Sequence, residues 1–244
     1  MTPQKPVGRP RRQPKLRAAA GSPREEITAA AVRLFVEKGY VQTTMSDIAR
    51  EVGLNQSSVY YWFERKEAIL QEAVTINRAP LDYLARIESH SCSPAVQLYR
   101  LLHFDTAQMA LADIDFNEIE TIASSQPESF TEFWDDYARL HRTVAELIEA
   151  GIASEQFVDC EPHSTATTAL SVNEGMQKRY RRQTKHMPGS GHRFVYDPLD
   201  ADEWAHLAAS TTIRSLLRRP DEAREIRSQA GTGYHLPVND NQPS

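Results

Sequence analysis

The chain has 244 residues, of which 40% are hydrophobic and 25% charged, so it can bury a sizeable core in one or two domains. No apolar run approaches the roughly 18 residues that a membrane-spanning helix needs, and no apolar signal segment follows the start, so we expect a cytoplasmic protein without a membrane partner. Two cysteines, Cys92 and Cys160, are too few for a disulfide framework.

The net charge of −5 hides an asymmetry along the chain. Residues 1–66 contain 12 Lys and Arg against 6 Asp and Glu, whereas the remainder contains 16 against 27. A basic segment of this kind attracts phosphate groups. The charge distribution therefore places a polyanion-binding surface within the N-terminal quarter of the chain.

The first 21 residues contain six Lys and Arg, four prolines and no acidic residue, and we expect this basic arm to be disordered when free. The run Gly8-Arg9-Pro10-Arg11 resembles the core of an AT-hook, which lies in a narrow A·T minor groove. We predict that Arg9 and Arg11 contact the minor groove or phosphates of double-stranded DNA. A solvated tail without a partner is the alternative.

Residues 22–39 are predicted to form the first helix. Ser22 and Glu25 can form a capping box around Pro23 at the first helical position, and Gly39 ends the helix. An apolar stripe at helical spacing predicts that the helix packs across the elements that follow it. The stripe consists of Ile27, Ala30, Ala31, Leu34 and Phe35.

Residues 43–66 are predicted to form two short helices separated by a turn at Gly53, which can adopt the left-handed conformation. Thr44 is a candidate N-cap for the first of these helices and Asn55 for the second. On the second helix, Val59 and Phe63 are four residues apart and can pack inward. The opposite face carries Gln56, Ser57, Ser58, Tyr60 and Tyr61, with Trp62 at its edge.

This arrangement predicts a helix-turn-helix whose second helix enters the DNA major groove. Gln can bond adenine edges, and Ser can reach either a base or a phosphate. We therefore predict that Gln56, Ser57 and Ser58 contact base edges of a double-stranded operator.

A set of short motifs follows in a fixed order in and around this stretch: Gly39-Tyr40, Thr43-Thr44, Asp47-Ile48-Ala49, Val52-Gly53-Leu54, Val59-Tyr60-Tyr61-Trp62-Phe63 and Lys66-Glu67. Together they resemble the N-terminal domain of the TetR/AcrR transcriptional regulators. About 45 residues match in order and spacing, which is more specific than a lone helix-turn-helix. The family usually has a smaller residue, often histidine, where Trp62 stands. The resemblance implies contacts to phosphates or base edges from Thr44, Ser46, Tyr60, Tyr61, Trp62 and Lys66.

The rest of the chain shows no strand-like alternation of useful length, so we predict an all-α fold: an N-terminal three-helix helix-turn-helix domain followed by a C-terminal helical bundle. Pro80 and Gly151 are predicted to end the helices that precede them. We expect further helices over residues 66–77, 80–89, 93–112, 116–125, 127–150, 162–185 and 200–219. The predicted domains are the arm 1–21, the DNA-binding domain 22–67, a ligand-binding and dimerisation domain 68–220 and a flexible tail 221–244.

In the family, the last two long helices form a four-helix dimer interface, which implies a homodimer here; intramolecular core is the alternative explanation of their apolar stripes. A basic cluster on the first of them, Lys178, Arg179, Arg181 and Arg182, is explained by the helix macrodipole and solvation. The family binds a small molecule in its bundle, and the aromatic side chains suggest an apolar or aromatic effector. The candidate contacts are His103, Phe104, Met109, Phe116, Phe130, Phe133, Trp134, Tyr137 and His141.

No catalytic constellation converges in the sequence. The acidic run Asp113, Asp115, Glu118 and Glu120 fits a solvated face, and His186 and His192 lack the spacing of a zinc site. We therefore predict no enzymatic activity, cofactor or metal, and expect a repressor released from a palindromic operator by its effector. Two other classes stay open: a constitutive nucleoid or scaffold protein that binds DNA through the arm, and an enzyme housed in the bundle.

Overall fold

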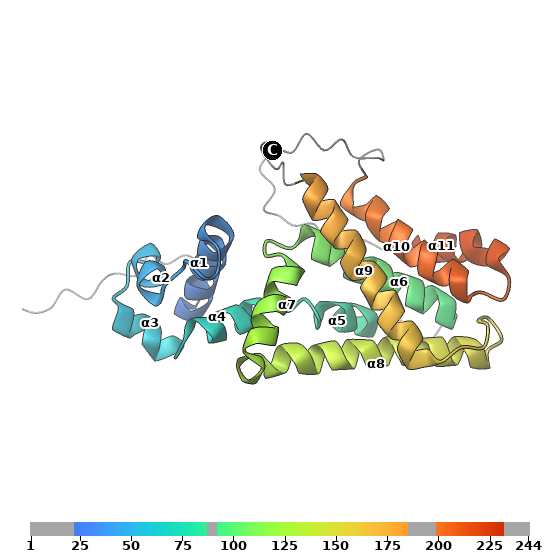
Figure 1. Ribbon diagram of the computed structural model, residues 1–244, viewed down its shortest axis with the longest axis horizontal. Helices are drawn as coiled ribbons and strands as arrows, with labels where there is room; N and C mark the ends of the chain where they lie inside the picture. The colour runs from blue at the N-terminus through green and yellow to red at the C-terminus, as the bar shows by residue number, and fades with distance from the viewer. Residues whose placement is uncertain (1–21, 87–91, 185–198, 232–244) are drawn as a thin grey trace, which may run out of the picture. The chain divides into compact units, whose positions relative to one another are not determined.

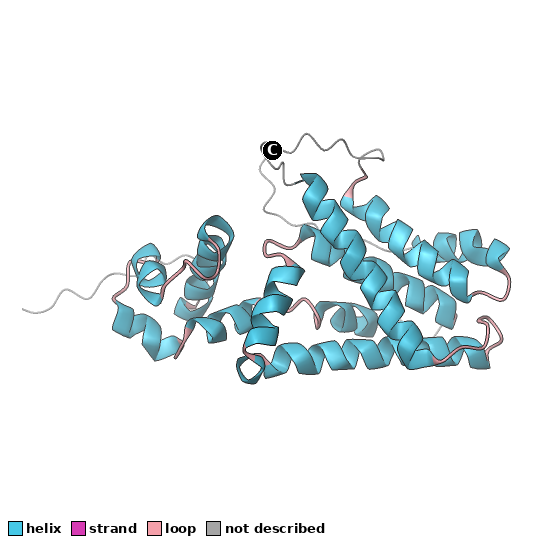
Figure 2. Ribbon diagram, in the orientation of Figure 1, coloured by secondary structure: helices cyan, strands magenta, loops and turns pink. Residues whose placement is uncertain are grey.

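The computed structural model describes residues 22–86, 92–184 and 199–231, and every regular element within these ranges is a helix (Figures 1 and 2). The predicted all-α fold is confirmed. None of these helices combines the length and apolarity needed to span a bilayer. The chain divides into two compact units, Met1–Ala73 and Val74–Ser244.

The N-terminal unit contains a compact four-helix region that we call the head. Its helices are α1 (Pro23–Lys38), α2 (Met45–Glu51), α3 (Gln56–Trp62) and α4 (Lys66–Ala73). The predicted stripe of α1 is buried, and α1 packs against α2 and α4. The predicted boundary after residue 67 lies in the first turn of α4, which belongs to the head because Ile69 and Leu70 are buried in its core.

The C-terminal unit is built around one central helix, α6, with α5, α8, α9, α10 and α11 packed against it (Figure 1). The α6 helix is buried on nearly every side, as expected of a helix at the centre of a bundle. The bounds are α5 (Ala79–Arg86), α6 (Pro94–Leu111), α7 (Phe116–Ser125), η2 (Pro127–Ser129), α8 (Thr131–Ala153), α9 (Pro162–Thr184), α10 (Ala201–Leu216), η3 (Pro220–Glu222) and α11 (Ala223–Gly231). Cys92 and Cys160 are free, half-buried thiols.

Helix α4 is shorter than predicted and ends at Ala73, not near Asn77. The chain turns here because Asn77 and Arg78 bond to α8. Asn77 donates its side-chain amide to the carbonyl of Phe133, and the Arg78 guanidinium pairs with the buried carboxylate of Asp136 at 2.8 Å. Tertiary contacts therefore outweigh the local helical pattern.

The prediction that Gly151 ends a helix is wrong. Helix α8 begins at Thr131, after the short turn η2, and continues through Gly151 to Ala153. The glycine is needed for packing, since the ring of Phe157 occupies the space that a Cβ at this position would take. Phe157 is itself completely buried.

Two further features of the bundle differ from the sequence prediction. Residues 223–231 form α11, which packs on α6 and α10 through the buried side chains of Ile226 and Ala230, where a flexible tail was predicted. Arg181 is buried and not solvated: its guanidinium donates to the carbonyls of Met109 and Ala110 at 3.4 Å and to that of Asp113 at 3.1 Å. It thereby satisfies carbonyls that the end of α6 leaves unpaired.

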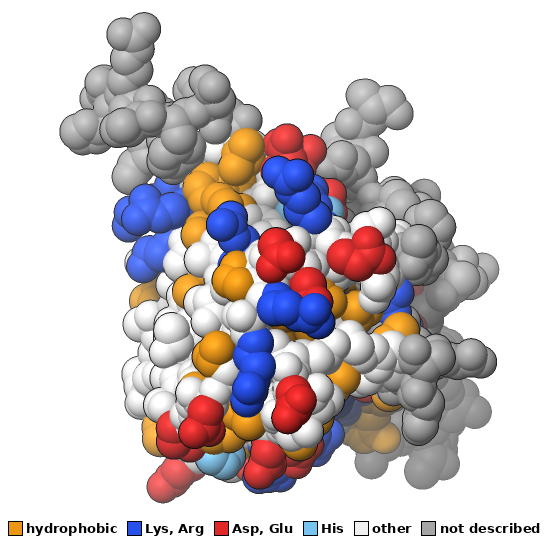
Figure 3. Space-filling model, turned by 90° about the vertical axis from the view of Figure 1, so that its right-hand side faces the viewer, with side chains coloured by type: hydrophobic (Ala, Val, Ile, Leu, Met, Phe, Trp, Pro, Cys, Tyr) orange, Lys and Arg blue, Asp and Glu red, His pale blue; other side chains and the backbone are white. Residues whose placement is uncertain are grey.

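Acidic and basic side chains are interspersed on the face of the molecule that Figure 3 shows. The net negative charge of the chain beyond residue 66 is therefore not gathered into one acidic patch on that face.

Candidate nucleic-acid interface

The turn between α2 and α3 has the geometry of a helix-turn-helix. Gly53 adopts φ +69°, in the left-handed region, and the N–H of Leu54 donates to the carbonyl of Ala49 at 2.9 Å. Helix α3 then starts at its N-cap, Asn55, whose side-chain oxygen accepts from the backbone N–H of Ser58 at 2.8 Å. The turn and both caps were predicted from the sequence and are confirmed.

Helix α3 separates an inward and an outward face, as predicted. Val59 is buried on its inward face, and Phe63, just beyond its end, is buried as well. On the other side Gln56 and Ser57 are exposed, and the side chain of Tyr61 is 80% exposed. Ser58 and Trp62 are half-buried, and Tyr60 is exposed. An open concavity runs along this side, lined by Pro23, Leu54, Asn55, Ser57, Ser58, Tyr61 and Trp62.

The two serines share one acceptor at the start of α3. The hydroxyls of Ser57 and Ser58 donate to the side-chain oxygen of Asn55 at 2.7 and 2.8 Å. Each hydroxyl keeps its lone pairs for an incoming donor and can rotate to donate elsewhere. The start of α3 thus offers short, preoriented polar groups of the type that contact base edges and phosphates.

Arg24 ties the end of α3 to α1 and α4. Its guanidinium pairs with the carboxylate of Glu72, donates to the backbone carbonyl of Trp62 at 3.3 Å, and lies over the ring of Phe63 at 4.5 Å. The hydrogen bond and Coulomb attraction of Glu72 raise the pKa of Arg24. These contacts fix the angle of α3 relative to α1 and α4 within the head.

Lys66 holds the connection between α1 and α2. Its ammonium group donates to the carbonyls of Tyr40 and Thr43 at 2.6 and 2.9 Å and lies 4.1 Å from the centre of the Tyr40 ring. Burial lowers the pKa of Lys66. Two of the three N–H donors of this ammonium are thus used inside the head, and the third is available for the predicted phosphate contact.

We expect Lys66→Met to destabilise the head by about 1–3 kcal/mol, because the two carbonyls lose a charged donor. The matched control is Arg65→Met, which removes the same charge from an exposed neighbouring residue. Urea unfolding of both variants measures the effect. If the two variants unfold at the same urea concentration, Lys66 does not stabilise the head. If Lys66→Met then only lowers the salt dependence of DNA binding, the role of Lys66 is a phosphate contact.

Thr44 and Ser46 are exposed at the start of α2. The Thr44 hydroxyl forms a capping box with Asp47: it donates to the Asp47 carboxylate at 2.8 Å and accepts from the Asp47 N–H at 3.1 Å. These hydrogen bonds lower the pKa of Asp47 to about 2. Arg9 and Arg11 of the basic arm lie outside the described residues.

Four of the predicted effector contacts come together in the C-terminal unit. Phe116 of α7 lies 6.2 Å from Phe133, and Phe133 lies 5.0 Å from Trp134, which is followed by Tyr137 at 6.2 Å (ring centres). The other candidates are placed differently. Phe104 stacks on Tyr83, Met109 and Phe130 are buried, His141 bonds to Thr167, and His103 lies beside Asp202.

A buried polar cluster, which was not predicted, lies between α6, α8 and α9. Asp105 accepts from the side-chain amide of Asn173 at 2.9 Å, and Gln177 is completely buried with neither side-chain polar atom hydrogen-bonded in the described part of the chain. Glu174 accepts from the hydroxyl of Tyr137 at 3.4 Å, which connects the cluster to the aromatic side chains. Burial raises the pKa of Asp105 to about 6 and that of Glu174 to about 7.

The sequence did contain a signal for this cluster. Asn173, Gln177 and Arg181 continue, at helical spacing, the apolar stripe of α9 that includes Ala166 and Leu170. Polar residues on a core-facing stripe are costly unless they are paired or bind something, so they mark a candidate site.

As pH rises, we expect the unsubstituted protein to lose stability relative to the Asp105→Asn variant. Since the folded pKa of Asp105, about 6, exceeds the unfolded value of 3.8, the folded state binds more protons between these values, and stability falls with increasing pH. Asn cannot ionise, so the difference in unfolding free energy should grow by on the order of 2–3 kcal/mol from pH 4 to pH 7. Urea unfolding at several pH values measures this; a constant difference would contradict it.

Residues 27–73 match a family described as "Bacterial regulatory proteins, tetR family". The negative transcriptional regulator of the biofilm operon icaADBC, IcaR, from Staphylococcus aureus is 39% identical over 64 residues, which cover 26% of this chain and 33% of IcaR. The alignment thus spans about a third of the length of this relative.

Solved structures resemble the chain over most of its length. A transcriptional regulator of the TetR/AcrR family from Thermobifida fusca is 25% identical, with a TM-score of 0.58 over 78% of this chain and 96% of that chain. AmtR of Mycobacterium smegmatis is 22% identical, with a TM-score of 0.61 over 91% and 99%. The similarity to AmtR is evidence for a shared fold and for nothing beyond the fold.

The family profile covers the helix-turn-helix, and the predicted resemblance rests on the same residues. The geometry of the helix-turn-helix and the similarity of the whole fold to a TetR/AcrR regulator agree with this resemblance. Residues 27–73 of this chain are therefore a DNA-binding domain of the tetR family of bacterial regulatory proteins, and the chain as a whole has the fold of TetR/AcrR regulators.

Proposed function

We propose that this chain represses transcription by binding a palindromic operator as a homodimer and is released by a small-molecule effector. The observation that carries the proposal is the outward polar face of α3, with Tyr61 80% exposed and Gln56 and Ser57 open to solvent. The contacts of Arg24 with Trp62 and Glu72 hold this face in place. The name of IcaR, a negative regulator, supports repression over activation. We assign no enzymatic activity to the chain.

The DNA contacts that we propose fall into two groups. Gln56, Ser57 and Ser58 lie at the start of α3, where recognition helices contact base edges. Tyr60, Tyr61, Trp62, Thr44, Ser46 and Lys66 would contact phosphates or base edges, and Arg9 and Arg11 the minor groove. Phosphate contacts supply affinity and orientation, whereas base contacts supply specificity.

For the homodimer, we propose an interface formed by α9 and α10. The apolar stripes of both helices are largely buried within the chain, including Leu170, Trp204 and Ile213. Another side of α10 stays open, where Leu207 is 42% exposed and Thr211 is exposed one turn later. Isologous packing of these sides would bury Leu207 in a four-helix interface.

For the effector, we propose the region where the aromatic side chains of α7 and α8 meet the buried polar cluster of α6 and α9. Phe133, Trp134 and Tyr137 favour an apolar or aromatic body. Gln177 favours a ligand that also carries a hydrogen-bonding group, because its side-chain polar atoms have no hydrogen-bond partner in the described residues. The buried carboxyl of Asp105, already bonded to Asn173, favours a cationic group nearby. The effector would act by favouring one of two conformers of the dimer.

Selection of duplexes from random DNA, followed by footprinting, tests the proposal. We expect a pseudo-palindromic site protected over two half-sites, with their centres roughly 34–36 Å apart or somewhat more. Sedimentation should give two chains per duplex. An asymmetric site protected by one chain would contradict the homodimer, and enrichment of no sequence would favour a nucleoid or scaffold protein that binds through the arm.

A further inference from the structure

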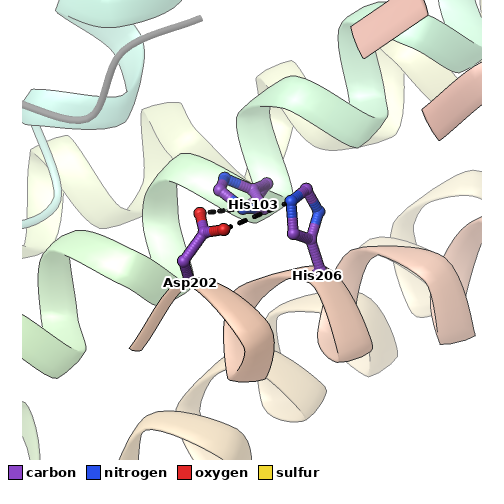
Figure 4. Close-up of side chains that lie close together, drawn as sticks. All are labelled: His103, Asp202 and His206. Carbon is purple, nitrogen blue, oxygen red and sulfur yellow. Dashed lines mark ion pairs between the residues drawn. The ribbon is translucent and has the colours of Figure 1, made fainter. Parts of the chain in front are cut away.

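His103 and His206 lie side by side between α6 and α10, and both face Asp202 (Figure 4). The Nε2 atom of His103 lies 3.0 Å from one carboxylate oxygen of Asp202, and the Nε2 atom of His206 lies 3.5 Å from the other. The centres of the two imidazole rings are 4.2 Å apart. No other group of three His, Cys, Asp or Glu side chains in the described ranges comes this close together.

The separations fit a shared metal ion. Ligand atoms about 2.1 Å from a tetrahedral ion stand roughly 3.4 Å from one another. One potential ligand atom from each of the three residues lies within 4.8 Å of the other two. The two Nε2 atoms stand 3.0 Å from one Asp202 oxygen and 3.5 Å from the other, on either side of the tetrahedral value. Only small side-chain rotations would be needed to close the cluster around an ion.

Tyr99 can hold His206 in the tautomer that binds a metal. Its hydroxyl oxygen lies 2.8 Å from Nδ1 of His206 and 3.2 Å from the hydroxyl of Ser210. When Nδ1–H donates to Tyr99, and Tyr99 donates to Ser210, the lone pair of Nε2 points towards Asp202. Ligating histidines commonly donate their second N–H in this way, which fixes the ring.

One of the three side chains is buried, and the other two are partly exposed to solvent, from which an ion could enter. His103 is 2% exposed, whereas the side chains of His206 and Asp202 are 22% and 50% exposed.

We propose that His103, Asp202 and His206 form a binding site for a divalent first-row transition metal. Two imidazole nitrogens and one carboxylate oxygen are a ligand set of zinc sites that keep the fourth position open, and Zn²⁺ fits best. Bound metal would join the middle of α6 to the first turns of α10. This proposal does not depend on operator binding.

Titration of chelator-treated, full-length protein with Zn²⁺ by calorimetry tests the site, with Co²⁺ as a spectroscopic probe. We expect one ion per chain and the intense visible absorption of four-coordinate cobalt. Asp202→Asn and His206→Asn should each weaken binding by about 100-fold or more. Tyr99→Phe removes the hydroxyl that orients His206 but leaves all three ligands in place, and should weaken binding by about 10-fold. Mg²⁺ should not compete, because it prefers oxygen ligands.

The matched control is His163→Asn, since His163 is exposed and stacks on His141 away from the proposed site. This variant should bind Zn²⁺ like the unsubstituted protein. The melting temperature of each variant without metal shows whether the fold is retained. Added Zn²⁺ should raise the melting temperature of the unsubstituted protein and of His163→Asn more than that of Asp202→Asn or His206→Asn. Equal affinity in Asp202→Asn and His163→Asn, or the weak absorption of six-coordinate cobalt, would overturn the proposal.

Discussion

Replacing Gln56 and Tyr61 together by alanine is expected to weaken binding to the selected operator by about 100-fold or more, since each lost contact to a base or phosphate costs about 1–3 kcal/mol. Both side chains project from α3 into solvent, so the stability of the head should change by less than about 0.5 kcal/mol. Fluorescence anisotropy with labelled duplex measures the affinity, and urea unfolding measures the stability.

Val36→Ala is the matched control for this double variant. Val36 is 54% exposed on α1 of the same head, so its truncation removes a comparable surface side chain outside α3. Operator affinity should be unchanged. The interpretation of α3 as the reading helix is wrong if the double variant binds the operator as tightly as this control does.

A large loss of stability is expected from Gly151→Ala. The added Cβ would collide with the ring of Phe157, which is buried and hydrogen-bonded through its backbone N–H to the carbonyl of Gly151 at 3.0 Å. Overpacking of this kind costs about 1–3 kcal/mol, and more where the neighbour is confined. Urea unfolding followed by tryptophan fluorescence measures the loss.

Gly175→Ala, in the same bundle, is expected to have the opposite effect on stability. A Cβ at Gly175 would meet no atom within 4 Å, and the residue lies inside α9, so alanine should stabilise the helix by about 0.5–1 kcal/mol. Phe157→Leu should partly rescue Gly151→Ala, because it shortens the side chain that collides. If both alanine variants shift stability in the same direction, close packing at Gly151 is not what requires glycine there.

The head could be predicted from sequence because its determinants are local. Ser22 and Glu25 cap α1 three residues apart, and Gly53 needs only its own backbone freedom to make the turn. Asn55 likewise caps α3 from the adjacent position. Each of these signals acts within one helical turn, so the spacing along the chain is sufficient to identify it.

The parts that sequence missed depend on residues far apart in the chain. Gly151 was predicted to end a helix, since its packing against Phe157 leaves no local pattern. His103 and Asp202 are separated by about a hundred residues, and only the packing of α6 on α10 brings them together. The role of Arg181 in satisfying carbonyls at the end of α6 is equally non-local.

The proposed function depends on DNA binding that distinguishes one sequence from another. Binding through the arm and phosphates alone would depend on salt but not on sequence, whereas binding through α3 depends on both. Arg24 contributes to specificity because it fixes the end of α3 within the head, which lets Gln56 and the serines reach the same base edges in every complex. Lys66 holds the connection between α1 and α2 in the same head.

The most direct test compares the affinity of the full-length protein for the selected palindrome with its affinity for a scrambled duplex of the same length at the same salt concentration. If α3 reads base edges, the palindrome should bind about a thousandfold tighter or more. A ratio close to one would mean that the polar face of α3 does not read sequence.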